Sequence, residues 1–264
     1  SLNSFPNRRS SDLKFQPFWE AITSEQWVLS IIESGYCLEL TSTPLNIPPQ
    51  KTHIKPSPPT APLRRSTITS SKGCSRGSAS TTTRQGSLLP LLPHSQKGWK
   101  VRPILDLRPL NKYILSEHFH MVTLLEVIPL LQQGDFMTAL DLKDASFHIP
   151  IHHAHRSHLR FVVNNQHYPF KVLPFGVTTA PRVFTKCLAV VAAHLRRGGT
   201  RVFPYLDDWL IKSASEQQCL LHTQRGLSLL QKLGLTIKIA KSHLKPLRIQ
   251  PFLGAVLKMV TAKA

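Results

Sequence analysis

Apolar residues recur at two different spacings along this chain, and the two spacings alternate. Helical spacing predicts helices at residues 15–40, 123–133, 179–197 and 213–233. Short apolar runs predict strands at 138–141, 158–163, 166–172 and on both sides of an acidic turn at 205–208. Helices interspersed with antiparallel strands predict an α+β fold, because the sheet must bury at least one face against helices.

Local signals place the ends of the predicted helices. A Ser or Thr followed three residues later by Glu or Gln predicts a capping box, and such pairs are Thr23/Gln26, Thr123/Glu126 and Ser213/Glu216. The glycines that predict helix ends are Gly35, Gly134, Gly198 and Gly234. Pro129 argues against a full-length helix at 123–133. The last helix is expected to bury Leu220, Leu227 and Leu230.

Residues 41–98 differ in composition from the rest of the chain. The segment holds 9 Pro, 19 Ser or Thr and 8 Lys or Arg, with no Asp or Glu. It lacks periodic apolar residues, so it cannot bury enough surface to offset the entropy cost of ordering. We expect a disordered basic linker at 41–98, between an N-terminal helical segment at 1–40 and a main domain at 99–264.

Two adjacent carboxylates, Asp207 and Asp208, lie in the predicted turn between apolar strands. Because like charges side by side repel, a cation is their natural companion, and hard oxygen ligands suit Mg²⁺. A solvated structural turn is the alternative interpretation of so short a motif. Asp141 ends a second apolar strand. A third carboxylate there could complete a site for two metal ions.

Six sequence blocks follow one another through the C-terminal part of the chain. They are Trp99–Lys112, Ala139–Ile151, Leu173–Gly176 with Ala180–Phe184, Tyr205–Asp208, Leu233–Thr236 with Lys241–Ser242, and Phe252–Gly254. In this order they resemble the reverse transcriptase domain of retroelements, most closely that of DIRS-type retrotransposons. The resemblance implies a polymerase palm-and-fingers fold, in which helices back a mostly antiparallel sheet.

The resemblance also implies roles for individual residues. Asp141, Asp207 and Asp208 would be the catalytic acids and would hold two Mg²⁺ ions, for which Mn²⁺ can substitute. Tyr205 and Leu206 would open the active-site hairpin. The residues implied to bind the incoming dNTP are Lys100, Arg102, Ser146, Phe147, Phe175, Gly176 and Lys241. An arginine fork suits phosphate oxygens, although a surface position remains the alternative for Arg102 and for Lys241.

Ser146 departs from the pattern of the family. Family members carry Tyr or Phe at this position, where the ring excludes a ribose 2′-hydroxyl. Serine is too small to do so, and the resemblance therefore predicts weakened selection of dNTPs over rNTPs, or a decayed site. Phe147, next along the chain, matches the family.

The charge balance favours a polyanionic partner. The chain of 264 residues has 33 Lys and Arg against 14 Asp and Glu, which gives a net charge of +19. A ribosomal or membrane-surface protein would share such an excess, and only its combination with an acidic cluster favours a polymerase. The expected partners are an RNA template, a DNA primer, dNTPs and retroelement partner proteins, with no membrane.

The cysteines indicate a reducing compartment. Cys37, Cys74, Cys187 and Cys219 include no CxxC pair and show no disulfide spacing. The sequence shows no leader and no apolar run near the ~18 residues of a membrane span. We therefore expect a soluble intracellular protein, nuclear or cytoplasmic.

Five histidines crowd one short stretch of the chain. They are His148, His152, His153, His155 and His158. Histidine is a common metal ligand, but no Cys or acid near them in the sequence completes a zinc site. Solvated or phosphate-facing histidines are therefore the favoured interpretation.

Two functional hypotheses of different classes follow. The first is an RNA-directed DNA polymerase that joins a dNTP to a primer 3′-hydroxyl. The second is a truncated, inactive relic that binds nucleic acid through charge alone. Three features favour the second hypothesis. They are Ser146, the lack of recognisable fingers strands in 41–98, and the end of the chain ten residues after Gly254, before any thumb or ribonuclease H domain. A frame shift within 41–98 or a flexible basic arm would account for the missing strands. The three intact acids favour the first hypothesis.

Overall fold

A four-stranded antiparallel sheet forms the centre of the molecule. The computed structural model describes residues 14–44, 52–56, 101–163 and 166–259. The strands are β3 (Phe136–Asp141), β6 (Arg201–Tyr205), β7 (Asp208–Ser213) and β8 (His243–Leu247), in the spatial order β6-β7-β3-β8. Every neighbouring pair is antiparallel, which confirms the predicted α+β architecture.

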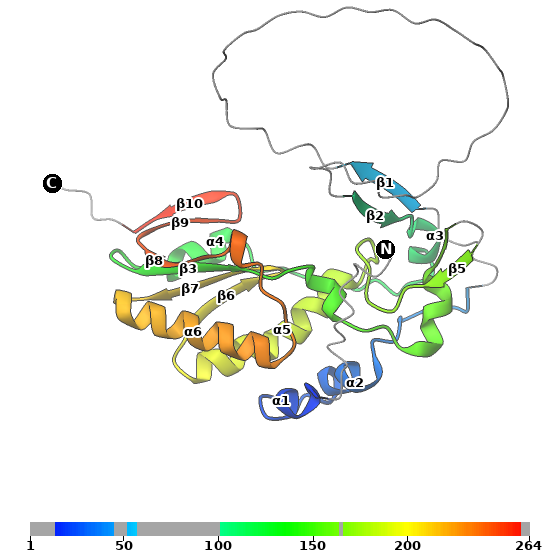
Figure 1. Ribbon diagram of the computed structural model, residues 1–264, viewed down its shortest axis with the longest axis horizontal. Helices are drawn as coiled ribbons and strands as arrows, with labels where there is room; N and C mark the ends of the chain where they lie inside the picture. The colour runs from blue at the N-terminus through cyan, green and yellow to red at the C-terminus, as the bar shows by residue number, and fades with distance from the viewer. Residues whose placement is uncertain (1–13, 45–51, 57–100, 164–165, 260–264) are drawn as a thin grey trace, which may run out of the picture.

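Two long helices cover one face of this sheet, as Figure 1 shows: α5 (Ala180–Arg197) and α6 (Glu216–Lys232). The other face is covered by α4 (Leu124–Val127) and the hairpin of β9 (Ile249–Phe252) and β10 (Ala255–Lys258). Successive residues of β7 point to opposite faces, so Trp209 and Ile211 belong to the main core while Leu210 packs with Met137 and Phe252. Because both faces are covered, β7 is buried from Trp209 to its end.

The helix α5 confirms its prediction, whereas α6 corrects two details. Ser213 ends β7, and the N-cap of α6 is Ser215, whose hydroxyl accepts the Gln218 N–H. Leu220 is exposed, because the buried face of α6 is made by other residues. These are Cys219, His222, Thr223, Gly226 and Leu230. A Cβ on Gly226 would lie 3.2 Å from the Ile211 side chain, so glycine there lets α6 approach the sheet.

The N-terminal segment forms two short helices, α1 (Gln16–Glu20) and α2 (Gln26–Ser34). The predicted capping box at Thr23 does not form, because Glu25 is the N-cap and the Thr23 hydroxyl accepts the Glu25 N–H instead. Gly35 ends α2 with φ of 93°, as expected. The buried indole of Trp19 donates a hydrogen bond to the Leu233 carbonyl at 3.2 Å, which ties this segment to the end of α6.

A two-stranded sheet, a hairpin and a short helix form the other end of the molecule (Figure 1). The strand β1 (Thr52–Pro56) pairs with β2 (Val101–Leu105), and β4 (Arg160–Val163) pairs with β5 (Gln166–Pro169). The helix α3 (Arg108–Asn111) follows β2. The β4–β5 hairpin confirms the prediction with shorter strands, and its turn lies outside the described residues. Within the predicted linker at 41–98, residues 52–56 form β1, whose pairing with β2 supplies its backbone hydrogen bonds, and residues 57–98 lie outside the described residues.

The capping box at Thr123 and Glu126 forms as predicted. The helix it begins is short, because Pro129 lies in a 3-10 turn (Ile128–Leu130) that directly follows α4. Gly134 then adopts φ of 89° and leads into β3. Among the described residues, no helix is long and apolar enough to cross a membrane.

Candidate active site

Three acidic residues lie at the same end of the strands of the central sheet. Asp141 is the last residue of β3 and Asp208 the first of β7, and the two face each other as register partners. Asp207 lies in the two-residue turn between β6 and β7. Its carbonyl accepts the N–H of Leu142 at 2.8 Å, which joins the turn to the end of β3. The structure therefore brings together the three acids that the sequence singled out.

A buried tryptophan supports the turn that carries Asp207. Leu206 adopts φ of 49°, a left-handed conformation that costs a non-glycine residue about 1–2 kcal/mol. The Trp209 indole donates to the Leu206 carbonyl at 3.3 Å, and its ring is fully buried in the main core. Tyr205 pairs with Asp208 at the base of the turn. Packing of Trp209 in the core thus supports the turn that carries Asp207.

Asp141 is held by a segment that sequence reasoning did not single out for this role. The Asp141 N–H donates to the Ser242 hydroxyl at 3.0 Å, and that hydroxyl donates to the Lys238 carbonyl at 3.1 Å. The Lys238 N–H donates to the Asp141 carbonyl at 2.7 Å. Ser242 follows the 3-10 turn η5 (Ile239–Lys241), so the side chain of this serine links η5 to the end of β3.

The acids interact electrostatically with one another and with Lys241. Burial raises the pKa of Asp208 above its ordinary value, and the charges of Asp207 and Asp141 raise it further. The positive charge of Lys241 opposes this rise. Asp207 is exposed, whereas Asp141 and Asp208 are half-buried. The cluster therefore concentrates negative charge that a cation would neutralise.

Two aromatic rings and a loop held by hydrogen bonds involve the segment that follows β3. Phe147, in the 3-10 turn η3 (Ala145–His148), has its ring centroid 5.0 Å from that of Phe175. Gly176 adopts φ of 99°, and its carbonyl accepts the Asn111 side-chain amide at 2.8 Å. The Asn111 oxygen accepts the Thr178 N–H at 3.1 Å. Asn111 is thus a positioning residue of this loop that sequence reasoning missed.

Three other predicted nucleotide-binding residues lie in different settings. Ser146 is buried at 5% exposure, and its hydroxyl has no hydrogen-bond partner among the described residues. Arg102 lies in β2 opposite Lys55. Lys100 lies outside the described residues. Their roles stay predictions.

His148 corrects the expectation of a solvated or phosphate-facing histidine. It is 6% exposed, its Nδ1–H donates to the Ala145 carbonyl at 2.9 Å, and its Nε2 accepts the Thr236 N–H at 3.0 Å. These partners require the neutral ring with its proton on Nδ1. Burial lowers the pKa of His148, in agreement with that state. The ring joins the turn after β3 to the loop after α6.

The sheet, its helices and the acidic hairpin define the palm and fingers of a nucleic-acid polymerase. Solved structures of foamy viral protease–reverse transcriptase share this fold. The one in complex with double-stranded DNA has a TM-score of 0.54 and 22% identity, and the match covers 64% of this chain and 28% of that chain. The one in complex with an RNA/DNA hybrid has a TM-score of 0.53 and 21% identity, over 61% and 22% of the two chains.

The chain belongs to the reverse transcriptase (RNA-dependent DNA polymerase) family, whose sequence model matches residues 95–257. The genome polyprotein of Petunia vein clearing virus is 27% identical over 155 residues, 59% of this chain and 7% of that protein. The Transposon Tf2-3 polyprotein of Schizosaccharomyces pombe is 27% identical over 165 residues, 62% of this chain and 12% of that protein. The chain thus spans a small part of these relatives, and its kinship to DIRS-type elements stays a prediction.

Proposed function

We propose that this chain is the polymerase domain of a retroelement and adds dNTPs to the 3′-hydroxyl of a DNA primer on an RNA template. The observation that carries the proposal is the pairing of Asp141 with Asp208 beside the Asp207 turn. Asp141 ends β3, Asp208 begins β7, and the turn before β7 carries Asp207. The three carboxylates therefore lie at the same end of the sheet, where a substrate can reach them. Membership of the reverse transcriptase family supports the same conclusion.

The acidic cluster fits divalent cations. Carboxylate oxygens are hard ligands that suit Mg²⁺ and Mn²⁺, and the mutual repulsion that raises the pKa of Asp208 would be relieved by bound positive charge. Asp141, Asp207 and Asp208 would hold two Mg²⁺ ions. Bound there, the ions would supply charge neutralisation and a more acidic primer hydroxyl. The protein residues would contribute mainly positioning, which the hydrogen bonds around Asp141 and Leu206 support.

The residues beside the cluster suit an incoming nucleotide. Lys241 lies close enough to Asp208 to influence its titration, and a lysine there would face the triphosphate or the departing pyrophosphate. The Phe147 and Phe175 pair offers an aromatic surface, and Gly176 lets the backbone approach the nucleotide. Arg102 and Lys100 would bind the phosphates from the fingers. The net charge of +19 supports binding of template and primer.

A catalytically inactive nucleic-acid-binding relic is the second candidate function. The buried Ser146 favours it, because the family places an aromatic ring at this position to select the sugar. A chain that is active but has lost this ring would instead discriminate poorly between dNTPs and rNTPs. Incorporation assays with dNTP and with rNTP separate the two outcomes: the relic incorporates neither, whereas the active chain incorporates both with similar kcat/KM values.

Primer extension by the purified chain on an RNA template, with Mg²⁺ and dNTPs, tests the proposal. Asp207→Asn should abolish extension, whereas Glu216→Gln should not, since Glu216 lies in the first turn of α6 beyond the opposite end of β7. Salt-sensitive nucleic-acid binding should be kept in both variants. Binding without extension in the unsubstituted chain would favour the relic.

A further inference from the structure

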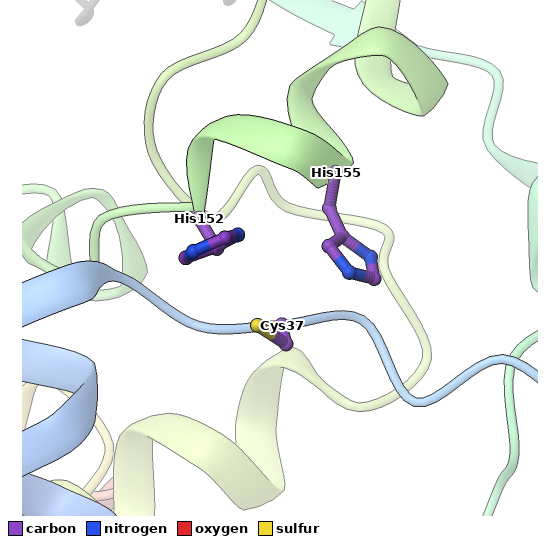
Figure 2. A group of neighbouring side chains, drawn as sticks. All are labelled: Cys37, His152 and His155. Atoms are coloured by element: carbon purple, nitrogen blue, oxygen red, sulfur yellow. The ribbon is translucent and has the colours of Figure 1, made fainter.

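Cys37, His152 and His155 come from distant parts of the sequence and gather in one place. Cys37 follows α2, and the two histidines lie at the start of the 3-10 helix η4 (His153–Leu159). Their ligand atoms all lie within 4.8 Å of one another. Figure 2 shows the three side chains meeting in the space between the segment of Cys37 and the helix that carries His155. The cysteine that the histidine-rich stretch lacks in sequence is thus supplied by the fold.

Backbone hydrogen bonds fix the segment of Cys37 against His152. The Tyr36 N–H donates to the Pro150 carbonyl at 2.7 Å, and the His152 N–H donates to the Tyr36 carbonyl at 3.0 Å. Gly35 makes this approach possible, because a Cβ there would lie 2.6 Å from the His152 nitrogen. Tyr36 itself is buried. The position of Cys37 beside the histidines is therefore determined by packing and by the backbone.

The two histidines stand on the same side of their helix. The His155 N–H donates to the His152 carbonyl at 3.0 Å, and residues three apart eclipse each other in a 3-10 helix. Their ring centroids lie 6.1 Å apart with the rings nearly perpendicular. The guanidinium of Arg156 donates to the Ile151 carbonyl at 2.9 Å, which holds the turn in place.

Both imidazoles carry a nitrogen that lacks a partner. The Nδ1 atoms of His152 and His155 are buried and accept or donate no hydrogen bond among the described residues. A buried polar atom left in this way costs about 1–3 kcal/mol. The Cys37 side chain is exposed, so the group can be reached from solvent. Imidazole nitrogen and thiolate sulfur are ligands that suit Zn²⁺, unlike the hard oxygen ligands at the carboxylate cluster.

We propose that Cys37, His152 and His155 bind one zinc ion, with water as the fourth ligand. In a tetrahedral zinc site such donors lie about 3.3–3.7 Å apart. Side-chain rotations that move the donor atoms by about 1 Å complete this geometry. The ion joins the segment after α2 to η4 and thereby stabilises the attachment of the N-terminal helices. This site involves none of the residues proposed to perform polymerisation.

Titration of the full chain, free of any tag and of metal, with Co²⁺ tests the proposal. Cobalt in a tetrahedral site with a thiolate ligand gives an intense charge-transfer band and visible d–d bands, which one equivalent of Zn²⁺ should remove. Cys37→Ser should abolish the charge-transfer band, and His155→Asn should weaken cobalt binding at least ~10-fold. The matched controls Cys74→Ser and His243→Asn should retain the wild-type spectrum, because the His243 side chain is exposed in β8.

Thermal unfolding supplies a second measurement that does not depend on the spectrum. Zn²⁺ added after chelation should raise the Tm of the wild type and of both controls, but not that of Cys37→Ser. Absence of a thiolate band in the wild type would overturn the proposal. A band that survives Cys37→Ser, or an equal zinc effect on the Tm of that variant, would also overturn it. None of these outcomes bears on primer extension with Mg²⁺, so the two proposals fail independently.

Discussion

The Lys212 ammonium lies 2.7 Å from a carboxylate oxygen of Asp135, and both side chains are almost fully buried, at 5% and 4% exposure. Lys212 pairs with Met137 across the β3–β7 ladder, and Asp135 directly precedes β3. The same ladder ends with Asp141 opposite Asp208. Because a slip of one residue would turn every side chain of a strand to the other face, a buried ion pair at one end helps to fix the acids at the other.

Removal of one partner of this ion pair should destabilise the protein strongly. Lys212→Met leaves the buried Asp135 carboxylate without its cation, which is expected to lower the free energy of unfolding by about 3–5 kcal/mol. The double variant Asp135→Asn/Lys212→Met should recover part of that loss, because no uncompensated charge remains. Urea unfolding measures both variants. If the two changes were simply additive, the ion pair would not couple the strands.

Neutralisation of Asp208 should stabilise the fold while it removes a proposed metal ligand. The raised pKa of Asp208 means that the folded state disfavours the charged carboxylate, so Asp208→Asn should increase the free energy of unfolding at neutral pH. The gain should fade as the pH falls through the raised pKa of Asp208 in the folded state, and it should vanish below about 4, where the carboxyl is protonated in both states. Urea unfolding across this pH range, with Glu216→Gln as the control, measures it. A gain that did not depend on pH would contradict the electrostatic explanation.

His148 should make stability depend on pH. Its lowered pKa means that the unfolded state binds the proton first, so stability should fall as the pH drops below about 6.5. Burial also lowers the pKa of His222, which should contribute in the same direction. His148→Gln should reduce the slope of unfolding free energy between pH 7 and 5, whereas the exposed His153→Gln should keep it. Equal slopes in both variants would refute a role for buried His148.

Loss of the Ser242 hydroxyl should loosen Asp141 without removing any ligand. Ser242→Ala leaves the Asp141 N–H without its acceptor and should cost about 0.5–1.5 kcal/mol of stability. We expect kcat for primer extension to fall about 10-fold, with little change in the KM for dNTP, because only positioning is affected. Ser242→Thr keeps the hydroxyl and should rescue most of the activity. A rise in KM alone would point to nucleotide binding instead.

Local patterns in the sequence were sufficient for the elements that carry the site. The apolar runs that end in Asp141 and begin after Asp208, together with the spacing of α5, depend only on neighbouring residues, and all were predicted. The sequence predicted the first residues of the helices less accurately than the helices themselves, because a Ser or Thr at more than one position can serve as the N-cap. Thr123 caps as predicted, whereas Ser215 replaces Ser213 at α6.

Tertiary structure alone decided which distant residues meet. The pairing of β3 with β7 sets Asp141 against Asp208, and the path of the chain after α6 buries His148 against Thr236. The same kind of long-range contact brings Cys37 to His152 and His155. Periodicity and capping act over a few residues, so the sequence by itself determined the elements and the chemistry they carry. Contacts across the fold depend on the packing of the whole core, and only the structure shows them.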